Sequence, residues 1–207
     1  MSRPPAPPLL LASTSPQRRA ILEQLGLPFD VVAPDYEEHD PPDADPVELV
    51  RAHAVGKARS AHRAGRTTLG VDTTVHLGVR IYAKPADAED AAAMLAELAG
   101  RTHAVLSGLC LVTERGERVA HAETLVTFRR LDAEAIAGYA ESGEWQGRAG
   151  GYAIQGLGGR LVERIEGDYL NVVGLPGSLL LDVLEQEAPF LLRSGGFPNP
   201  KLHSGGS

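Results

Sequence analysis

The 207-residue chain has one cysteine, one tryptophan and few aromatic residues, 5% of the total. A single cysteine, Cys110, cannot form an internal disulfide, and its place in an apolar run predicts a buried, unreactive thiol. Positive charge is also scarce, because the formal net charge is −7, which argues against binding nucleic acid or a membrane through a basic face. A small anionic ligand stays compatible with this charge wherever positive side chains converge.

The sequence has no apolar run of about 18 residues and no charged-then-apolar leader, so we expect neither a membrane span nor secretion. The predicted location is the cytoplasm. With 43% hydrophobic and 23% charged residues, the composition is that of an ordinary globular protein. We expect a proline-rich lead-in over residues 1–8, a single domain over 9–190, and a disordered tail over 191–207 without apolar periodicity.

Short apolar or β-branched runs alternate with segments of helical periodicity. The runs predict strands over residues 8–12, 29–33, 67–77 and 161–165, and a hairpin over 102–113 and 118–129. Helices are predicted to start at Pro16, to span 46–64, to run from Asp87 to Gly100, to follow Asp132, and to include 178–184.

Hydroxyl and guanidinium groups surround the predicted start of the first helix. Ser15 suits the N-cap and Pro16 the first helical position. Arg18 and Arg19 then fall in the first turn, where cations oppose the helix dipole. An anion there would meet free backbone N–H groups, the hydroxyl of Ser13 and both arginines. The placement therefore favours a phosphate or carboxylate site over arginines that only face water.

Two carboxylates are candidates for chemistry. Glu38 belongs to the acidic segment 35–42, which is either a solvated loop or a loop that holds a metal. Asp72 interrupts a strand rich in β-branched residues, where aspartate is depleted. It is either a strand-end residue that binds backbone or, as we favour, a catalytic or metal-binding carboxylate.

Two lysines have equally ambiguous positions. Lys57 lies near the apolar stripe of the second helix, where it either snorkels to water or reaches into a cleft. That stripe is predicted to contain Val47, Val50, Ala54 and Ala58. Lys84 precedes a proline, which holds it extended, so it either lies on the surface or is presented to a ligand.

The glycine-rich segment 147–176 indicates tight turns or close approach to a ligand, and it matches neither a Walker loop nor a dinucleotide fingerprint. Gln155 lies within it and could read a base edge through its amide. Arg148 adds a cation. Several cations with two carboxylates are the expected set for a nucleotide or another polyphosphate with a divalent metal.

Five segments in order, LLLASTSPQRRAILEQLGLPFDVV, VDTTV, AKP, GRAGGYAIQGLGG and GDYLNVVGLP, resemble the Maf family of nucleoside triphosphate pyrophosphatases over about residues 9–187. The resemblance implies an α/β, two-lobed mixed-sheet fold similar to inosine triphosphate pyrophosphatases, with the active-site cleft between the lobes. It also implies hydrolysis of a nucleoside triphosphate to the monophosphate and pyrophosphate with Mg²⁺ or Mn²⁺, and a possible homodimer.

By this resemblance, Asp72 is the proton acceptor and Glu38 closes the acidic loop, and either carboxylate could be a metal ligand. The resemblance assigns polyphosphate handling to Ser13, Arg18 and Lys57, and a catalytic role to Lys84. Arg148 stands where the family usually has lysine, and Gly147 where it usually has aspartate.

Three positions are linked to substrate choice in the family: the residue after Ser-Pro, the residue after the catalytic aspartate, and the glutamine of Ile-Gln-Gly. The branch that acts on dTTP and UTP has Arg, Thr and Gln there, and the 7-methyl-GTP branch has another residue, Gln and Glu. This chain has Gln17, Thr73 and Gln155, so two of the three favour dTTP, UTP and modified pyrimidine nucleotides, as in nucleotide house-cleaning. Gln17 keeps open a 7-methyl-GTP or broad-range pyrophosphatase.

A third hypothesis is a nucleotide-binding regulator of cell division with vestigial hydrolysis. Retention of the carboxylates Glu38 and Asp72 with Lys57 and Lys84 argues against it, because a pure binder has no need of a proton acceptor.

Overall fold

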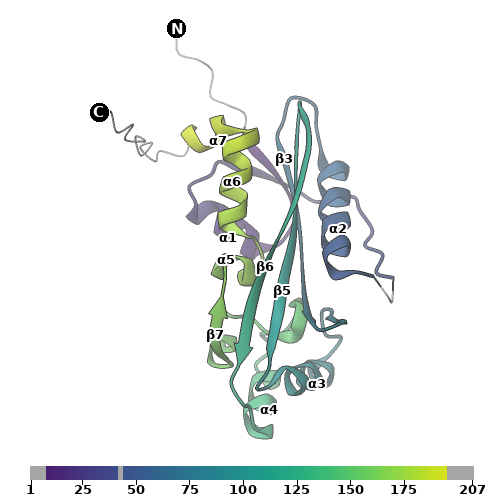
Figure 1. The fold of residues 1–207 in the computed structure, drawn as a ribbon, viewed down its shortest axis with the longest axis vertical. Helices are drawn as coiled ribbons and strands as arrows, with labels where there is room; N and C mark the ends of the chain where they lie inside the picture. Colours follow the sequence, from purple (N-terminus) through teal and green to yellow (C-terminus); the bar gives the residue numbers. More distant parts are fainter. Residues whose placement is uncertain (1–7, 42–43, 195–207) are drawn as a thin grey trace, which may run out of the picture.

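The computed structural model describes residues 8–41 and 44–194. Its described part is built on one seven-stranded mixed sheet, in the order β2-β1-β3-β5-β6-β7, with β4 paired to β3 (Figure 1). Helices lie on both faces of the sheet. The predicted α/β mixed-sheet class is therefore confirmed, and the likeness to inosine triphosphate pyrophosphatases stays a prediction.

The strands are β1 (Leu9–Ala12), β2 (Phe29–Val32), β3 (Thr68–Leu77), β4 (Arg80–Tyr82), β5 (Thr102–Thr113), β6 (Gly116–Phe128) and β7 (Val162–Glu166). The α-helices are α1 (Pro16–Gln24), α2 (Pro46–Ala61), α3 (Ala88–Leu98), α4 (Ala133–Glu141), α5 (Tyr169–Val173), α6 (Gly177–Glu187) and α7 (Pro189–Ser194). Two short 3-10 helices, η1 (Ala149–Gly151) and η2 (Leu157–Arg160), lie in the glycine-rich segment.

Strand β1 lies between two parallel neighbours, β2 and β3. The connection from β1 to β2 contains α1, and the connection from β2 to β3 contains α2, which packs on the other face of the sheet. The carboxyl end of β1 is therefore a point where the chain diverges to opposite faces, which is where open α/β sheets bind ligands.

Helix α1 begins as the sequence predicts. The Ser15 side chain accepts a hydrogen bond from the backbone N–H of Arg18 at 3.4 Å, and Pro16 is the first helical residue. Gly26 follows the helix with a φ of 67°, a left-handed conformation that glycine adopts without strain. These local signals fix where the guanidinium of Arg18 leaves the backbone.

Helix α2 packs directly on the sheet because two glycines face it from neighbouring strands. A Cβ at Gly70 on β3 would overlap the carbonyl oxygen of Ala54, and a Cβ at Gly108 on β5 would overlap that of Val50. The missing side chains let the helix backbone approach the strands closely. This approach places Lys57, one turn after Ala54, beside Asp72.

On the face of β3 opposite α2, the apolar residues form two separate clusters. Leu69 and Val71 pack with α1 and α6, whereas Val75 packs with α3 and with residues that follow α4. Thr73 lies between them on the same face, because side chains alternate along a strand. The two clusters are the cores of the two expected lobes, and polar residues occupy the boundary between them.

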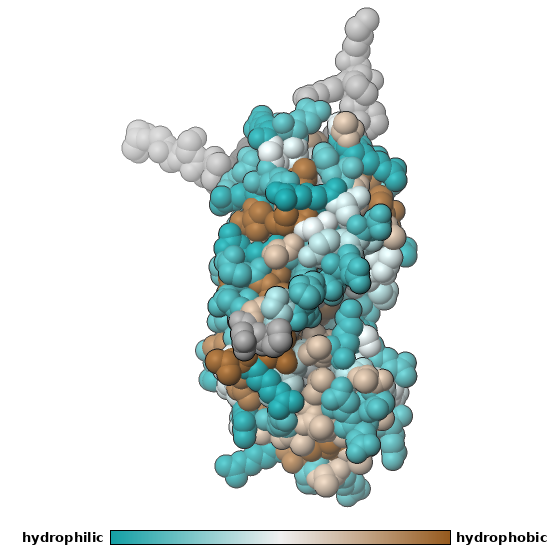
Figure 2. Space-filling view, turned by 90° about the vertical axis from the view of Figure 1, so that its right-hand side faces the viewer, coloured by the Kyte–Doolittle hydropathy of each residue, from teal (hydrophilic) through white to brown (hydrophobic). Residues whose placement is uncertain are grey.

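Several boundaries differ from the sequence predictions. Helix α2 ends at Ala61 rather than near residue 64, because His62 is extended and its Nδ1 lies 3.0 Å from the Thr68 hydroxyl. Val47 is only half-buried, and Leu49 lies in the core instead. The α2 face in Figure 2 is largely hydrophilic.

The predicted tail also starts too early. Helix α7 continues to Ser194. Leu191, the first residue assigned to that tail, is fully buried in the apolar cluster that contains Leu69 and Val71. The apolar triplet that ends at Leu192 was too short to show helical periodicity. The rest of the predicted tail, residues 195–207, and residues 1–7 of the lead-in lie outside the described residues.

Cys110 is fully buried, as predicted, and burial raises the pKa of its thiol to about 12. Across the described ranges, the search for a helix with the length and apolarity to span a membrane found none.

Candidate active site

The site forms where one edge of β3 is open. Pairing with β1 ends at Gly70, and pairing with β4 starts at Val75. Between them, residues 71–74 pair with β5 on one side only. Side chains from both faces of the sheet can meet across this gap.

Arg18 closes the gap from the α1 side. Its Nε–H donates to the carbonyl oxygen of Gly174 at 3.0 Å, and its two terminal nitrogens donate to Ser13 Oγ at 3.2 Å and Thr73 Oγ1 at 3.4 Å. Burial lowers the pKa of the guanidinium, and the charges of Asp72 and Glu38 act in the opposite direction. Arg18 is thus a fixed, charged group bonded only to neutral oxygens.

Lys57 joins the two candidate carboxylates on the α2 side. Its Nζ lies 2.6 Å from Asp72 Oδ1 and 2.5 Å from Glu38 Oε1. Burial opposes ionisation of Glu38, but the hydrogen bond and charge of Lys57, with the charge of Lys84, lower its pKa overall. Glu38 is therefore ionised at neutral pH. Lys57 itself is only 8% exposed, so it reaches into the structure and does not snorkel.

A cavity of about 620 Å³ opens between the two lobes, and Lys57, Asp72 and Glu38 are not among the residues that line it. The cluster lies near the cavity wall, because the charge of Lys84 on that wall lowers the pKa of Glu38, and the charges of Asp72 and Glu38 act on Arg18. The cavity wall includes three cations, Arg18, Lys84 and Arg148. Within residues 8–41 and 44–194, none of the three forms an ion pair with a carboxylate. Unpaired cations in a concave wall are arranged to receive an anionic ligand.

The glycine-rich loop forms another side of the cavity. Glu144 accepts hydrogen bonds from the backbone N–H groups of Leu157 at 3.0 Å and Gly158 at 3.2 Å. A Cβ at Gly156 would overlap the Glu144 carboxylate, so a larger residue there would have to displace that carboxylate. This clamp fixes the loop that presents Gln155 at the cavity wall.

Comparison with known proteins agrees with this geometry. A family model described as "Maf-like protein" matches residues 8–187. The chain belongs to the Maf family. The relatives of this Maf-family chain include a protein from Gloeobacter violaceus, named dTTP/UTP pyrophosphatase, which is 46% identical over 180 residues, 86% of this chain and 95% of the relative.

Two further relatives carry the same name. The one from Symbiobacterium thermophilum is 45% identical over 180 residues, 86% of this chain and 93% of its own. The one from Deinococcus radiodurans is 43% identical over 181 residues, 86% of this chain and 92% of its own. The predicted family is confirmed, and these relatives carry the name of the branch that the sequence analysis favours.

The two candidate metal ligands of this Maf-family chain lie close together. Glu38 and Asp72 both contact Lys57 Nζ, so their oxygens are close. No group of three or more His, Cys, Asp or Glu side chains suited to a metal occurs in the described part of the chain. Two carboxylates fit a Mg²⁺ ion that takes its other ligands from water and substrate phosphates, and they do not form an all-protein site.

Two predicted substrate ligands of helix α1, Gln17 and Arg19, lie in different environments. Gln17 lines the cavity, where its Oε1 accepts from the Ser15 hydroxyl at 3.0 Å. Arg19 is exposed and is not part of the cavity wall, because it lies about 100° around α1 from Arg18. The sequence analysis predicted both neighbouring arginines as substrate ligands, and only Arg18 lines the cavity.

Three groups were missed from the sequence. The carbonyl of Gly174 and the hydroxyl of Ser107 orient Arg18 and Thr73, and no sequence signal marks them. Glu144 could have been found from its position three residues before the glycine-rich segment 147–176, where a carboxylate can accept hydrogen bonds from exposed backbone N–H groups.

Proposed function

We propose that this chain hydrolyses nucleoside triphosphates to the monophosphate and pyrophosphate, with dTTP and UTP as preferred substrates. The observation that carries the proposal is the cavity wall with its three unpaired cations, next to the Lys57-bridged carboxylates. The three relatives described above are each named dTTP/UTP pyrophosphatase, which supports the same activity.

The cations bind the polyphosphate in this proposal. Arg18 is pre-oriented by three hydrogen bonds to neutral oxygens, so little side-chain entropy is lost when a phosphate binds. Lys84 and Arg148 approach from the opposite side of the cavity on segments that follow β4 and α4. A triphosphate held from both sides has its phosphoanhydride bond fixed relative to Asp72.

Asp72 is the proposed proton acceptor. A water molecule adds across the bond between the α- and β-phosphates, its proton passes to the Asp72 carboxylate, and pyrophosphate leaves. Lys57 holds that carboxylate in place at 2.6 Å. A Mg²⁺ or Mn²⁺ ion, held by Glu38 and Asp72, would neutralise phosphate charge and lower the pKa of a bound water.

Specificity is proposed to depend on the glycine-rich loop. Gln155 lines the cavity and offers both a donor and an acceptor to a base edge. The Thr73 hydroxyl contacts Arg18, Ser107 and the Gly174 carbonyl, so its proposed role is to orient Arg18. Gln17 stands where the resemblance implies an arginine in the dTTP/UTP branch, and its proposed effect is the loss of one phosphate or base contact or a broader specificity.

The decisive experiment is pyrophosphate release from dTTP, UTP, CTP, 7-methyl-GTP, dITP and the purine triphosphates, each with Mg²⁺ or Mn²⁺. We expect preference for dTTP and UTP, and a loss of about 10²-fold or more in kcat for Asp72→Asn. Arg18→Gln should reduce kcat/KM much more than Arg19→Gln, its exposed neighbour. Preference for 7-methyl-GTP would overturn the substrate assignment. The absence of metal-dependent turnover of every nucleotide tested would overturn the proposed enzymatic activity.

The homodimer and the cytoplasmic location stay predictions. Light scattering on the purified chain tests the first, and fractionation of cells tests the second.

A further inference from the structure

One buried imidazole binds the acidic loop at two points. His53, on α2, is 3% exposed, and both of its ring nitrogens have partners in the loop between β2 and α2. Its Nδ1 lies 2.9 Å from the Tyr36 hydroxyl, and its Nε2 lies 2.7 Å from Asp40 Oδ1. We call these three residues the Tyr36–His53–Asp40 chain.

The two hydrogen bonds engage both ring nitrogens. In the tautomer whose Nε2–H donates to the Asp40 carboxylate, Nδ1 accepts from the Tyr36 hydroxyl. A side chain with a single polar atom could not make both bonds, so the two ends of the loop depend on this one ring.

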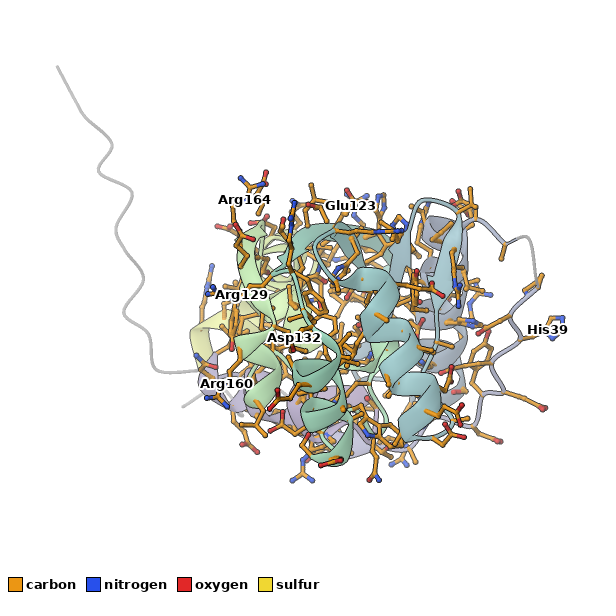
Figure 3. All side chains as sticks on the ribbon, turned by 90° about the horizontal axis from the view of Figure 1, so that it is seen from below. His39, Glu123, Arg129, Asp132, Arg160 and Arg164 are labelled. Atoms are coloured by element: carbon orange, nitrogen blue, oxygen red, sulfur yellow. The ribbon has the colours of Figure 1, made fainter. Side chains whose placement is uncertain are left out.

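Glu38 lies at the midpoint between the two bound residues. Side chains alternate along this extended segment, and His39 points away from the body of the protein (Figure 3). Tyr36 and Asp40, two residues to either side of Glu38, both turn toward α2. The carboxylate between them meets Lys57, which lies one turn after His53 on the same helix.

The packing adds a steric constraint. A Cβ at Gly56 would overlap the Tyr36 ring, so the ring occupies the space that a side chain at that helix position would fill. The Tyr36 and His53 rings also meet edge-on, with centroids 5.7 Å apart and planes at 62°. Residues 53, 56 and 57 of α2 therefore receive the loop as one surface.

We propose that the Tyr36–His53–Asp40 chain positions Glu38 for metal binding and catalysis by holding the acidic loop against α2. Glu38 has a 42% exposed side chain on a segment with no helix or strand of its own, so Lys57 alone does not fix it. The three members are positioning residues: Tyr36 and Asp40 belong to the loop of Glu38, His53 binds that loop from α2, and none of the three lines the cavity. This inference rests on the proposed function for what Glu38 does once it is placed.

The test compares Tyr36→Phe, which keeps the ring and removes the hydroxyl, with Tyr82→Phe as a matched control. Tyr82, on β4, is buried whereas Tyr36 is half-buried, and its hydroxyl likewise has a single side-chain partner, donating to Glu97 at 2.8 Å. Hydrogen exchange of segment 34–41 is measured first. We expect faster exchange there in Tyr36→Phe and His53→Asn, and wild-type exchange in Tyr82→Phe.

Binding of Mn²⁺ with α,β-imido-dUTP, followed by electron paramagnetic resonance, is measured second. Tyr36→Phe should weaken Mn²⁺ binding about fivefold, the equivalent of one net hydrogen bond, and His53→Asn about tenfold. In a Glu38→Gln background, Tyr36→Phe should cause no further loss, because it acts through that carboxylate.

The outcomes separate three claims: that His53 anchors the loop, that the anchoring positions Glu38, and that the chain is a pyrophosphatase. Unchanged exchange of segment 34–41 in His53→Asn overturns the anchoring. Faster exchange with unchanged Mn²⁺ binding, or an equal loss in the Glu38→Gln background, shows a purely structural role and overturns the positioning. A wild type that binds Mn²⁺ but hydrolyses no nucleotide overturns the proposed function alone.

Discussion

Lys57→Met removes the cation that two carboxylates share while it keeps the length of the side chain. Glu38 and Asp72 then face each other without compensation, at distances set by their former contact with one nitrogen. Like charges in a partly buried site repel, and each carboxylate loses a charge-assisted hydrogen bond. We therefore expect a large loss of stability when this one buried ammonium group is removed.

The magnitude follows from burial. Removing one partner of a buried ion pair typically costs about 3–5 kcal/mol. The Asp72 side chain is 13% exposed but that of Glu38 is 42% exposed, so water screens part of the repulsion. We expect a loss of about 3 kcal/mol, which corresponds to about 6–12 °C in Tm for a domain of this size.

Thermal unfolding at pH 7.5, followed by circular dichroism, measures this loss. Added Mg²⁺ should raise the Tm of Lys57→Met more than that of the wild type, because the ion can replace the missing charge between the carboxylates. Arg59→Met, on the same helix as Lys57, is the control: it breaks a partly exposed ion pair with Glu117 of β6 and should lower the Tm far less. A fall of less than about 2 °C in Lys57→Met, or equal stabilisation of both proteins by Mg²⁺, would refute the reasoning.

Three further predictions follow from the structure. Burial lowers the pKa of His103 to about 4, so the unfolded chain binds a proton first as pH falls, and stability is lost between about pH 6.5 and 4. Urea unfolding should show a loss of about 2 kcal/mol between pH 7.5 and 5 that disappears in His103→Gln; an unchanged pH dependence would contradict this. Gly156→Ala should displace Glu144, mobilise Gln155 and raise KM for UTP at least about tenfold with a smaller change in kcat; KM within twofold of the wild type would count against the clamp. Cys110, buried with a pKa of about 12, should react with iodoacetamide only after unfolding, as followed by mass spectrometry.

Much of the fold can be predicted from local pattern. The N-cap at Ser15, the apolar stripe through Val50, Ala54 and Ala58, and the period-2 strands each depend on residues close in sequence. Helix and strand ends were less accurate, as His62 and Leu191 show, because a tertiary contact decides where the last turn ends.

The sequence by itself determined which residue types were available and where α1 and β3 start, and so it identified Arg18, Lys57 and Asp72 as candidates. It left open whether Lys57 reaches water or a cleft, and whether Arg18 and Arg19 act together. Only the tertiary structure decided these points. Close packing of α2 over two glycines brings Lys57 to Asp72, and the rotation between neighbouring helical residues directs Arg18 inward and Arg19 outward. The rotation is a local property of the helix, but which side of α1 faces the sheet, and whether α2 lies close enough for Lys57 to reach Asp72, depend on packing between segments far apart in the chain.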